Sequence, residues 1–100
     1  MTRQIAFTPK AAKPPPAYSQ AVQEQTRQCM TNIQAVLEEA GSSLDKLVSV
    51  IVVLADEDDF AGMNDEWLTW FPSSPPARQD AKLPVRIPGL KVSIAAIAEA

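Results

Sequence analysis

An arginine two residues after a proline pair is the first candidate for chemistry in this chain. Arg78 comes after Pro75–Ala77, and an extended segment, Val92–Ala98, follows further on. Proline lacks a backbone N–H and disfavours helical geometry in the residue before it, so a preceding helix stops here and Arg78 begins a strand. Its guanidinium offers a planar set of donors that suits a carboxylate or a phosphate. The alternative is a structural arginine, because Asp80 falls on the same strand face and can pair with it.

The residue types that are missing narrow this chemistry. The chain has no histidine, one cysteine and three glycines. Zinc sites of the usual kind, Cys–His or Ser–His pairs and glycine-rich phosphate loops are therefore not expected, so we expect no metal and no other cofactor. Cys29 falls at helical spacing with Thr26, Ile33 and Val36, which favours a buried structural thiol over a nucleophile. A lone cysteine also fits a reducing compartment.

Length and charge limit the class of protein. One hundred residues, 46% of them hydrophobic, make one compact domain over 1–100 and not two. A domain of this size buries a modest fraction of its surface, so association with further copies would stabilise it. A net charge of −3 argues against a general nucleic-acid binder, and no apolar run is long enough to span a bilayer. We therefore expect neither a nucleic-acid partner nor a membrane partner.

The first helix is predicted from a stripe of residues at steps of three and four. The stripe consists of Val22, Thr26, Cys29, Ile33, Val36, Leu37 and Ala40. Gly41 supplies the usual C-terminal stop, and Pro9–Pro16 before the helix is a connector. Because no glycine interrupts the pattern, we predict that the helix begins between Pro16 and Gln20.

A second helix is predicted after a cap at Asp56 or Asp58. One face of it carries aromatic and apolar residues, for which core packing is favoured over base stacking: Phe60, Met63, Trp67 and Trp70 or Phe71. Between the two helices, Leu47–Leu54 is β-branched and apolar on both sides, which predicts a central strand covered on both faces.

The remaining strands are shorter or more polar. They are predicted at Arg3–Phe7, Ala77–Val85 and Leu90–Ala98, and Pro84 makes the second of these an edge or a broken strand. The order β-α-β-α-β-β predicts an α+β fold with two helices on one face of a mixed sheet. We also predict association through the sheet side, with Val50, Val52 or their neighbours meeting a partner.

Five short motifs occur in one order along nearly the whole chain. They are Pro15–Val22, Gln25–Gln28 with Asn32–Ile33, Leu37–Gly41, Asp59–Ala61 with Asn64, and Pro76–Arg78. In this order they resemble the RidA family (YjgF/YER057c/UK114), the reactive-intermediate imine deaminases, from about Pro14 to Ala98. Each motif is weakly specific by itself, whereas five in the correct order are hard to obtain by chance.

The resemblance implies a fold, a reaction and a set of site residues. The fold is chorismate-mutase-like and assembles as a homotrimer with clefts between subunits. The reaction is metal-free hydrolysis of 2-imino acids, or their enamine tautomers, to 2-oxo acids and ammonia: a cation binds the carboxylate and one held water attacks the imine carbon. Arg78 takes the place of the carboxylate anchor, Tyr18 and Asn64 contact the substrate, and Ser93 stands at the catalytic position on the last strand.

This chain departs from the family pattern at two places. The family has a β-hairpin between the Tyr-Ser-Gln-Ala-Val motif and the following helix, whereas here Val22 runs directly into Gln23. The family's last strand carries two glutamates where this chain has Ser93 and Ala95, and the first glutamate positions or activates the water. A serine can hold a water but cannot act as a charged base near neutral pH. Loss of a general base removes about 10² to 10⁴ in rate.

Four hypotheses follow from these residues. The chain is a divergent imine deaminase that uses Arg78 as anchor, with Ser93 or a backbone carbonyl holding the water, or it is a binding or regulatory protein that kept the fold and lost turnover. The ribonuclease and translation-inhibitor activity of some relatives has little support here, because the chain is acidic and lacks histidine. The missing hairpin can also reflect a faulty gene model or a splice form. Cytosol and mitochondrion both fit the composition.

For Arg78 itself, the motif and its separation from Ser93 favour one geometry. We predict that its guanidinium faces a cleft, near Ser93 on the neighbouring strand, with donors left for a ligand.

Overall fold

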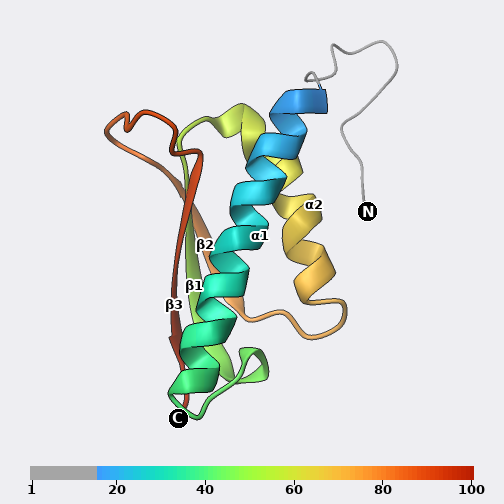
Figure 1. Cartoon of the computed structure of the whole chain (residues 1–100), viewed down its shortest axis with the longest axis vertical. Helices are drawn as coiled ribbons and strands as arrows, with labels where there is room; N and C mark the ends of the chain where they lie inside the picture. The colour runs from blue at the N-terminus through green and yellow to red at the C-terminus, as the bar shows by residue number, and fades with distance from the viewer. Residues whose placement is uncertain (1–15) are drawn as a thin grey trace.

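The computed structural model describes residues 16–100, with side chains from residue 20 onward, as a sheet covered on one face by two helices (Figure 1). The elements follow in the order α1 (Pro16–Glu39), β1 (Leu47–Leu54), α2 (Phe60–Trp70), β2 (Ala77–Lys82) and β3 (Val92–Ala98), with single 3₁₀ turns at Leu44–Lys46 and Glu57–Asp59. The predicted α+β class is confirmed. The predicted strand Arg3–Phe7 lies outside the described residues. None of the helices in the described part is long and apolar enough to cross a membrane.

Helix α1 begins at Pro16, within the predicted limits, and passes through Val22 and Gln23 without a break. Proline is favourable at the first helical position because its missing N–H would have no intrahelical partner there. The helix ends at a left-handed turn in which Gly41 has a φ of 79°, a geometry that glycine adopts without steric cost. The N–H of Ser42 donates to the carbonyl of Leu37 at 2.7 Å and closes this turn.

Strand β1 is the centre of a three-stranded sheet with the order β2-β1-β3. β2 pairs with β1 in parallel and β3 pairs with it antiparallel. The central place is explained by the composition of β1, since β-branched and apolar side chains fit a half-buried pleated surface. β2 is an edge strand and ends two residues before Pro84, as that proline predicts. Both late strands are shorter than the predicted segments Ala77–Val85 and Leu90–Ala98.

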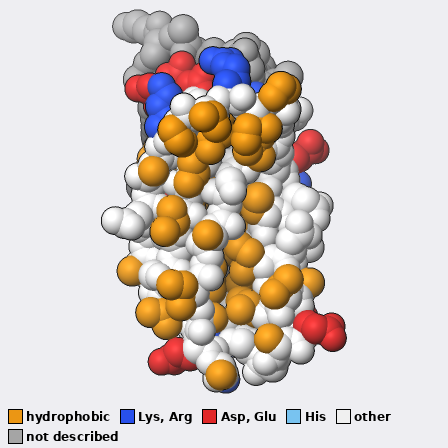
Figure 2. Space-filling view, turned by 90° about the vertical axis from the view of Figure 1, so that its left-hand side faces the viewer, with side chains coloured by type: hydrophobic (Ala, Val, Ile, Leu, Met, Phe, Trp, Pro, Cys, Tyr) orange, Lys and Arg blue, Asp and Glu red, His pale blue; other side chains and the backbone are white. Residues whose placement is uncertain are grey.

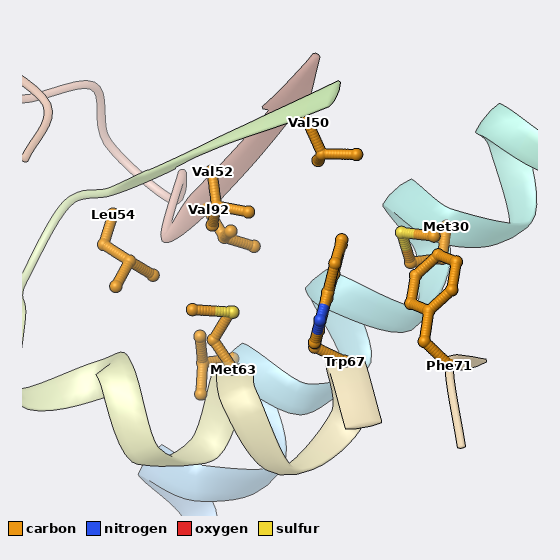
Figure 3. Close-up of a cluster of buried hydrophobic side chains, with 9 residues drawn as sticks. Met30, Val50, Val52, Leu54, Met63, Trp67, Phe71 and Val92 are labelled. Carbon is orange, nitrogen blue, oxygen red and sulfur yellow. The ribbon is translucent and has the colours of Figure 1, made fainter. Parts of the chain in front are cut away.

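The core fills the space between the helices and the inner face of the sheet. Its buried hydrophobic side chains are Val22, Met30, Val50, Val52, Leu54, Met63, Trp67, Phe71 and Val92. Figure 3 shows Met63 and Trp67 extending from α2 towards the side chains of the strands. The rings of Trp67 and Phe71 are tilted at 42° with centroids 4.5 Å apart. Phe60, which we predicted to join this face, is 42% exposed at the first turn of α2.

The buried stripe of α1 is rotated from its predicted position. Val22 and Thr26 are fully buried as predicted, and so is Met30, which the pattern did not include. Val36 is 68% exposed, and Ala40 is exposed as well. The reason is that α1 packs against α2 on one side, while its other flank lies beyond the edge of β3. No described strand covers that flank.

The face of the sheet away from the helices, called here the outer face, is uncovered. Register places nine residues on it: Ser49, Ile51, Val53, Ala77, Gln79, Ala81, Ser93, Ala95 and Ile97. None of the nine is charged, and Figure 2 shows acidic and basic groups mainly at the ends and margins of this face. The prediction that β1 is covered on both sides is therefore wrong for the single chain, where Ile51 is 44% exposed. Val50 and Val52, predicted to meet a partner, face the helices instead.

A buried carboxylate joins the two helices. Glu66 of α2 is 8% exposed, and its two oxygens are both bonded. Arg27 of α1 donates to Oε1 at 3.0 Å, and the indole N–H of Trp70 donates to Oε2 at 2.9 Å. Because a buried charge is costly unless it is paired, this arrangement fixes how α1 and α2 lie against each other.

We predict that Met63→Ala destabilises the fold far more than Leu68→Ala. Met63 is fully buried between α2 and the sheet, whereas Leu68 on the same helix is 44% exposed. Truncation of a buried methionine costs about 2–5 kcal/mol, and a surface change stays within about 0.5 kcal/mol. Equilibrium urea unfolding measures both free energies, and equal losses would contradict this description of the core.

Candidate functional site

Arg78 lies at the start of β2, on the inner face of the sheet. It is in register with Val50, so its side chain is directed to the side that α2 covers. An ion pair joins it to Asp80: Nη2 donates to Oδ2 at 3.2 Å, and Nε lies 3.0 Å from Oδ1. The pairing that strand spacing allowed is therefore formed.

Aromatic rings of α2 hold the same guanidinium from the other side. Its central carbon is 5.0 Å from the centroid of the Trp67 ring and 5.8 Å from that of Phe60. The Arg78 side chain is 16% exposed, and Nη1 is buried without a hydrogen-bond partner. A buried donor without a partner is uncommon in folded proteins. It is the atom through which this residue can still donate a hydrogen bond to an anionic oxygen.

Helical spacing puts Asn64 on the side of α2 that carries Phe60 and Trp67. Asn64 follows Phe60 by four residues and precedes Trp67 by three, so all three share one side of α2. Asn64 is half-buried, and its amide can both donate and accept hydrogen bonds. Tyr18 lies in the first turn of α1, and its side chain is outside the described part.

Ser93 is not beside Arg78. The sheet order puts β1 between β2 and β3, and Ser93 is in register with Val53 on the outer face, while Arg78 is on the inner face. Strands β2 and β3, which we expected to be neighbours, are therefore separated by β1, because the connection between them crosses the end of β1. Within one chain, Arg78 and Ser93 cannot contact the same small molecule.

The thiol of Cys29 has the character of a structural group. It is half-buried, and its Sγ lies 4.0 Å from the carbonyl oxygen of Val92. Burial raises the pKa of Cys29, and a backbone hydrogen bond from Ile94 opposes this in part. A raised pKa keeps the thiol protonated near neutral pH, and the thiolate is the nucleophilic form.

The acidic residues are not gathered into a metal site in the part of the chain that the structure describes. Asp56 accepts from the N–H of Asp58 at 2.9 Å and so caps the turn before α2. Burial raises the pKa of Asp59, Lys91 lowers it, and the charges of Asp56 and Asp58 raise it further. These carboxylates thus lie at the start of α2, where Asp56 has a capping role.

Two contacts in and around the site were not foreseen from the sequence. Phe60 and Trp67 were assigned to core packing alone, although their spacing puts both on the side that meets Arg78. Gln25 of α1 spans the start of β3: its amide donates to the carbonyl of Gly89 at 2.8 Å and accepts from the N–H of Lys91 at 2.9 Å. No signal within the helix predicts that second contact, which depends on tertiary packing.

The family of the chain follows from a match over nearly its whole length. The family model described as Endoribonuclease L-PSP matches residues 4–100. A RutC family protein of Pyrococcus abyssi is 38% identical over 104 residues, covering 78% of this chain and 82% of the relative. The chain therefore belongs to this family, the RidA family whose motifs it resembles.

Other relatives are longer than this chain. Protein Mmf1 of Schizosaccharomyces pombe, described as mitochondrial, is 46% identical over 80 residues, which are 77% of this chain and 49% of the relative. A 2-iminobutanoate/2-iminopropanoate deaminase of Capra hircus is 39% identical over 77% of this chain and 56% of its own length. The chain thus spans about half the length of these two relatives.

Solved structures agree with the fold. A candidate translation initiation inhibitor from Salmonella typhimurium superposes with a TM-score of 0.74 at 34% identity, covering 79% of this chain and 70% of that one. TdcF of Escherichia coli with bound serine gives a TM-score of 0.71 at 29% identity, covering 77% and 63%.

The alignment with the Pyrococcus protein also supports the prediction that this chain lacks a segment found in relatives. It extends over 104 residues but takes in 78% of this 100-residue chain, so about 26 of its positions have no residue here. A β-hairpin with its turn is of this length. The sheet of this chain is correspondingly left with β3 at an edge.

We predict that Arg78 and Asp80 contribute to stability mainly as a pair. Arg78→Ala and Asp80→Ala should each lower the free energy of unfolding, and the double variant should lose less than their sum by about 0.5–1 kcal/mol. The pair is partly exposed, so the coupling is modest and weakens with added salt. A double-mutant cycle by urea unfolding at low and high salt measures it, and strict additivity would show that the ion pair does not contribute.

Proposed function

We propose that this chain is a small-carboxylate deaminase of the RidA type, which hydrolyses 2-imino acids to 2-oxo acids and ammonia with Arg78 as the carboxylate anchor. The observation that carries the proposal is the buried, unpartnered Nη1 of Arg78 beside Phe60 and Trp67. Family membership and a relative named as a 2-iminobutanoate/2-iminopropanoate deaminase support the reaction. The structure of TdcF with bound serine supports a ligand of amino-acid type.

The proposed anchor works by charge and geometry. Nη1 would donate to one carboxylate oxygen, while Asn64, on the same side of α2, would take the other or the imine nitrogen. The rings of Phe60 and Trp67 hold the guanidinium in place, which removes part of the entropy cost of binding. Water then adds to the imine carbon, and the C–N bond breaks with release of ammonia.

Asp80 is the feature that tunes this anchor. It already accepts a hydrogen bond from Nη2 of Arg78 and neutralises the local charge. An incoming carboxylate therefore meets a weaker electrostatic attraction and the repulsion of a second anion. We expect micromolar-to-millimolar affinity for a 2-oxo acid, in the range of roughly −8 to −4 kcal/mol.

A second candidate function is binding without turnover. It is favoured by the position of Ser93, which lies on the outer face with Ala95 and is separated from Arg78 by β1. No carboxylate stands among the nine residues of that face to act as a base. In this case the chain would bind 2-imino or 2-oxo acids as a regulatory or protective protein.

One experiment separates the two candidates. A PLP-dependent dehydratase generates 2-iminobutanoate from threonine, and the rate of 2-oxobutanoate formation is followed with and without the chain. Acceleration that disappears in Arg78→Ala, while Arg78→Lys retains part of it, supports the deaminase. Isothermal titration with 2-oxobutanoate that shows binding without acceleration supports the second candidate. Absence of both effects in a folded protein would refute the anchor role of Arg78.

We predict that Asp80→Asn increases the affinity for 2-oxobutanoate. The amide keeps the shape of Asp80 but removes its charge, so the guanidinium is released from a salt bridge in which the two side chains are 16% and 31% exposed. A gain of about three- to tenfold corresponds to a partly exposed ion pair of about 1 kcal/mol. The matched control is Glu57→Gln, which removes the exposed salt bridge to Lys82 near the other end of β2. Equal gains in both variants would indicate a change of net charge alone.

For assembly and compartment, the proposal follows the family resemblance. A homotrimer would cover the outer face, whose Ile51 and Ile97 are 44% and 66% exposed. A small 2-imino or 2-oxo acid is the proposed ligand, and nucleic acid and membrane are not proposed as partners. The cytosol and the mitochondrion are the proposed compartments, the latter being named for Mmf1.

A further inference from the structure

We propose that the edge of β3, which has no neighbouring strand within residues 16–100, pairs with the β3 edge of a second copy, antiparallel and centred on Ala95, to join two three-stranded sheets into one. The contact is separate from the outer face and does not depend on the proposed ligand. The proposal rests on two neighbouring features of residues 16–100: the edge of β3, which has no charged residue or proline, and an exposed apolar flank of α1 beside it.

The backbone groups at this edge are identified by the ladder with β1. The carbonyl of Lys91 accepts from Ala55 N–H at 2.9 Å, and Glu99 N–H donates to the carbonyl of Lys46 at 2.9 Å. The backbone N–H and C=O groups of the odd-numbered residues of β3 therefore point towards β1. In an antiparallel strand these directions alternate, so the backbone groups of the even-numbered residues point away from β1, towards the edge of the sheet. The residues with edge-directed backbone groups are Val92, Ile94, Ala96 and Ala98.

The two edges of the sheet differ in how they are protected. β2 carries Arg78, Asp80 and Lys82 within six residues, and such charges discourage pairing with another strand. β3 has no charged residue and no proline in its seven residues, Val92 to Ala98. Of the two edges, β3 alone has the features of a strand that accepts a partner.

The flank of α1 beside this edge is apolar and uncovered. Gln25 and Cys29 line the start of the edge through their contacts with Gly89, Lys91 and Val92. Two helical turns after Cys29, on the same side of α1, Val36 is 68% exposed. A strand added next to β3 would lie beneath this flank and bury Val36. The thiol of Cys29, at 4.0 Å from the carbonyl of Val92, is a weak contact that a ladder hydrogen bond can replace.

A second copy fits this edge in one register. With Ala95 opposite Ala95 of the other copy, the residues with edge-directed backbone groups pair with each other and can exchange hydrogen bonds: Val92 with Ala98 and Ile94 with Ala96. The residues that bracket the strand have opposite charge, Lys91 before it and Glu99 after it. The antiparallel arrangement brings the lysine end of one copy to the glutamate end of the other, whereas a parallel one would bring like charges together. The two-fold axis stands perpendicular to the sheet, so both α1 flanks lie on the same side and cover each other.

The test is a cross-link that depends on register. In a Cys29→Ala background, Ala95→Cys places two thiols in a pair without ladder hydrogen bonds, where Cα atoms are about 4.5 Å apart and a disulfide can form. Ile97→Cys in the same background is the control, because four residues of strand separate its two copies by about 13 Å. We expect a disulfide-linked dimer on a non-reducing gel for Ala95→Cys and none for Ile97→Cys. Packing through the outer face, on which Ile97 is 66% exposed, would link Ile97→Cys at least as fast, and that result would overturn the proposal.

The second arm removes the backbone donor. Ala96→Pro deletes an N–H that points away from β1, so the sheet of each copy is retained. Ala96→Val, which keeps the donor, is its matched control. By light scattering, the wild-type chain is expected as a dimer, or as a hexamer where edge pairing joins two of the proposed homotrimers. Ala96→Pro is expected to raise the dissociation constant of the edge contact on the order of tenfold or more, since two symmetry-related hydrogen bonds are lost. A folded wild-type monomer at high micromolar concentration, or a trimer unaffected by Ala96→Pro, would refute the edge contact.

Discussion

The continuous line of α1 that joins Val22, Thr26 and Met30 is the constraint on which the rest of the structure depends. All three are fully buried, four residues apart, and the Thr26 hydroxyl donates to the carbonyl of Val22 at 2.7 Å across the shortened junction. One residue more or fewer at this point would rotate the preceding turn by about 100° around the helix axis. The helix would then lose either its contact with the sheet or its place beside α2. The shortened chain keeps a single core because its two parts meet in helical phase.

The same junction explains why the sheet is incomplete. A longer relative aligns with about 26 positions that have no residue here, and the described sheet ends at β3, where α1 extends over an unoccupied edge. With Ser93 and Ala95 on β3, the outer face is uncharged as well. A face and an edge of this kind both favour association with other chains. The self-association proposed above would therefore follow from the fold, independent of the chemistry at Arg78.

Much of this architecture could be predicted from the sequence, because local signals decide it. The spacing in α1, the turn at Gly41 and the β-branched run of β1 each indicate their element without reference to the others. The position of Ser93 could not be predicted, because strand order is a tertiary property. Strands that follow each other in the chain usually pair, yet the connection after β2 passes over the end of β1. Of the partners of Arg78, Asp80 could be predicted because it lies on the same strand. Phe60 and Trp67 could not, because they approach from α2 and their contact depends on tertiary packing.

The stacking of Arg78 on Trp67 gives the protein an optical property. Trp67 is 3% exposed, and its ring lies 5.0 Å from the guanidinium, so a charge that arrives at or leaves Arg78 changes the electric field across the indole. The other tryptophan, Trp70, has its N–H bonded to Glu66, and only Trp67 lies against the guanidinium among the contacts described. Emission from Trp67, one of the two tryptophans in the chain, would therefore change when an anion binds Arg78. The protein would then report the occupancy of its candidate site without a label.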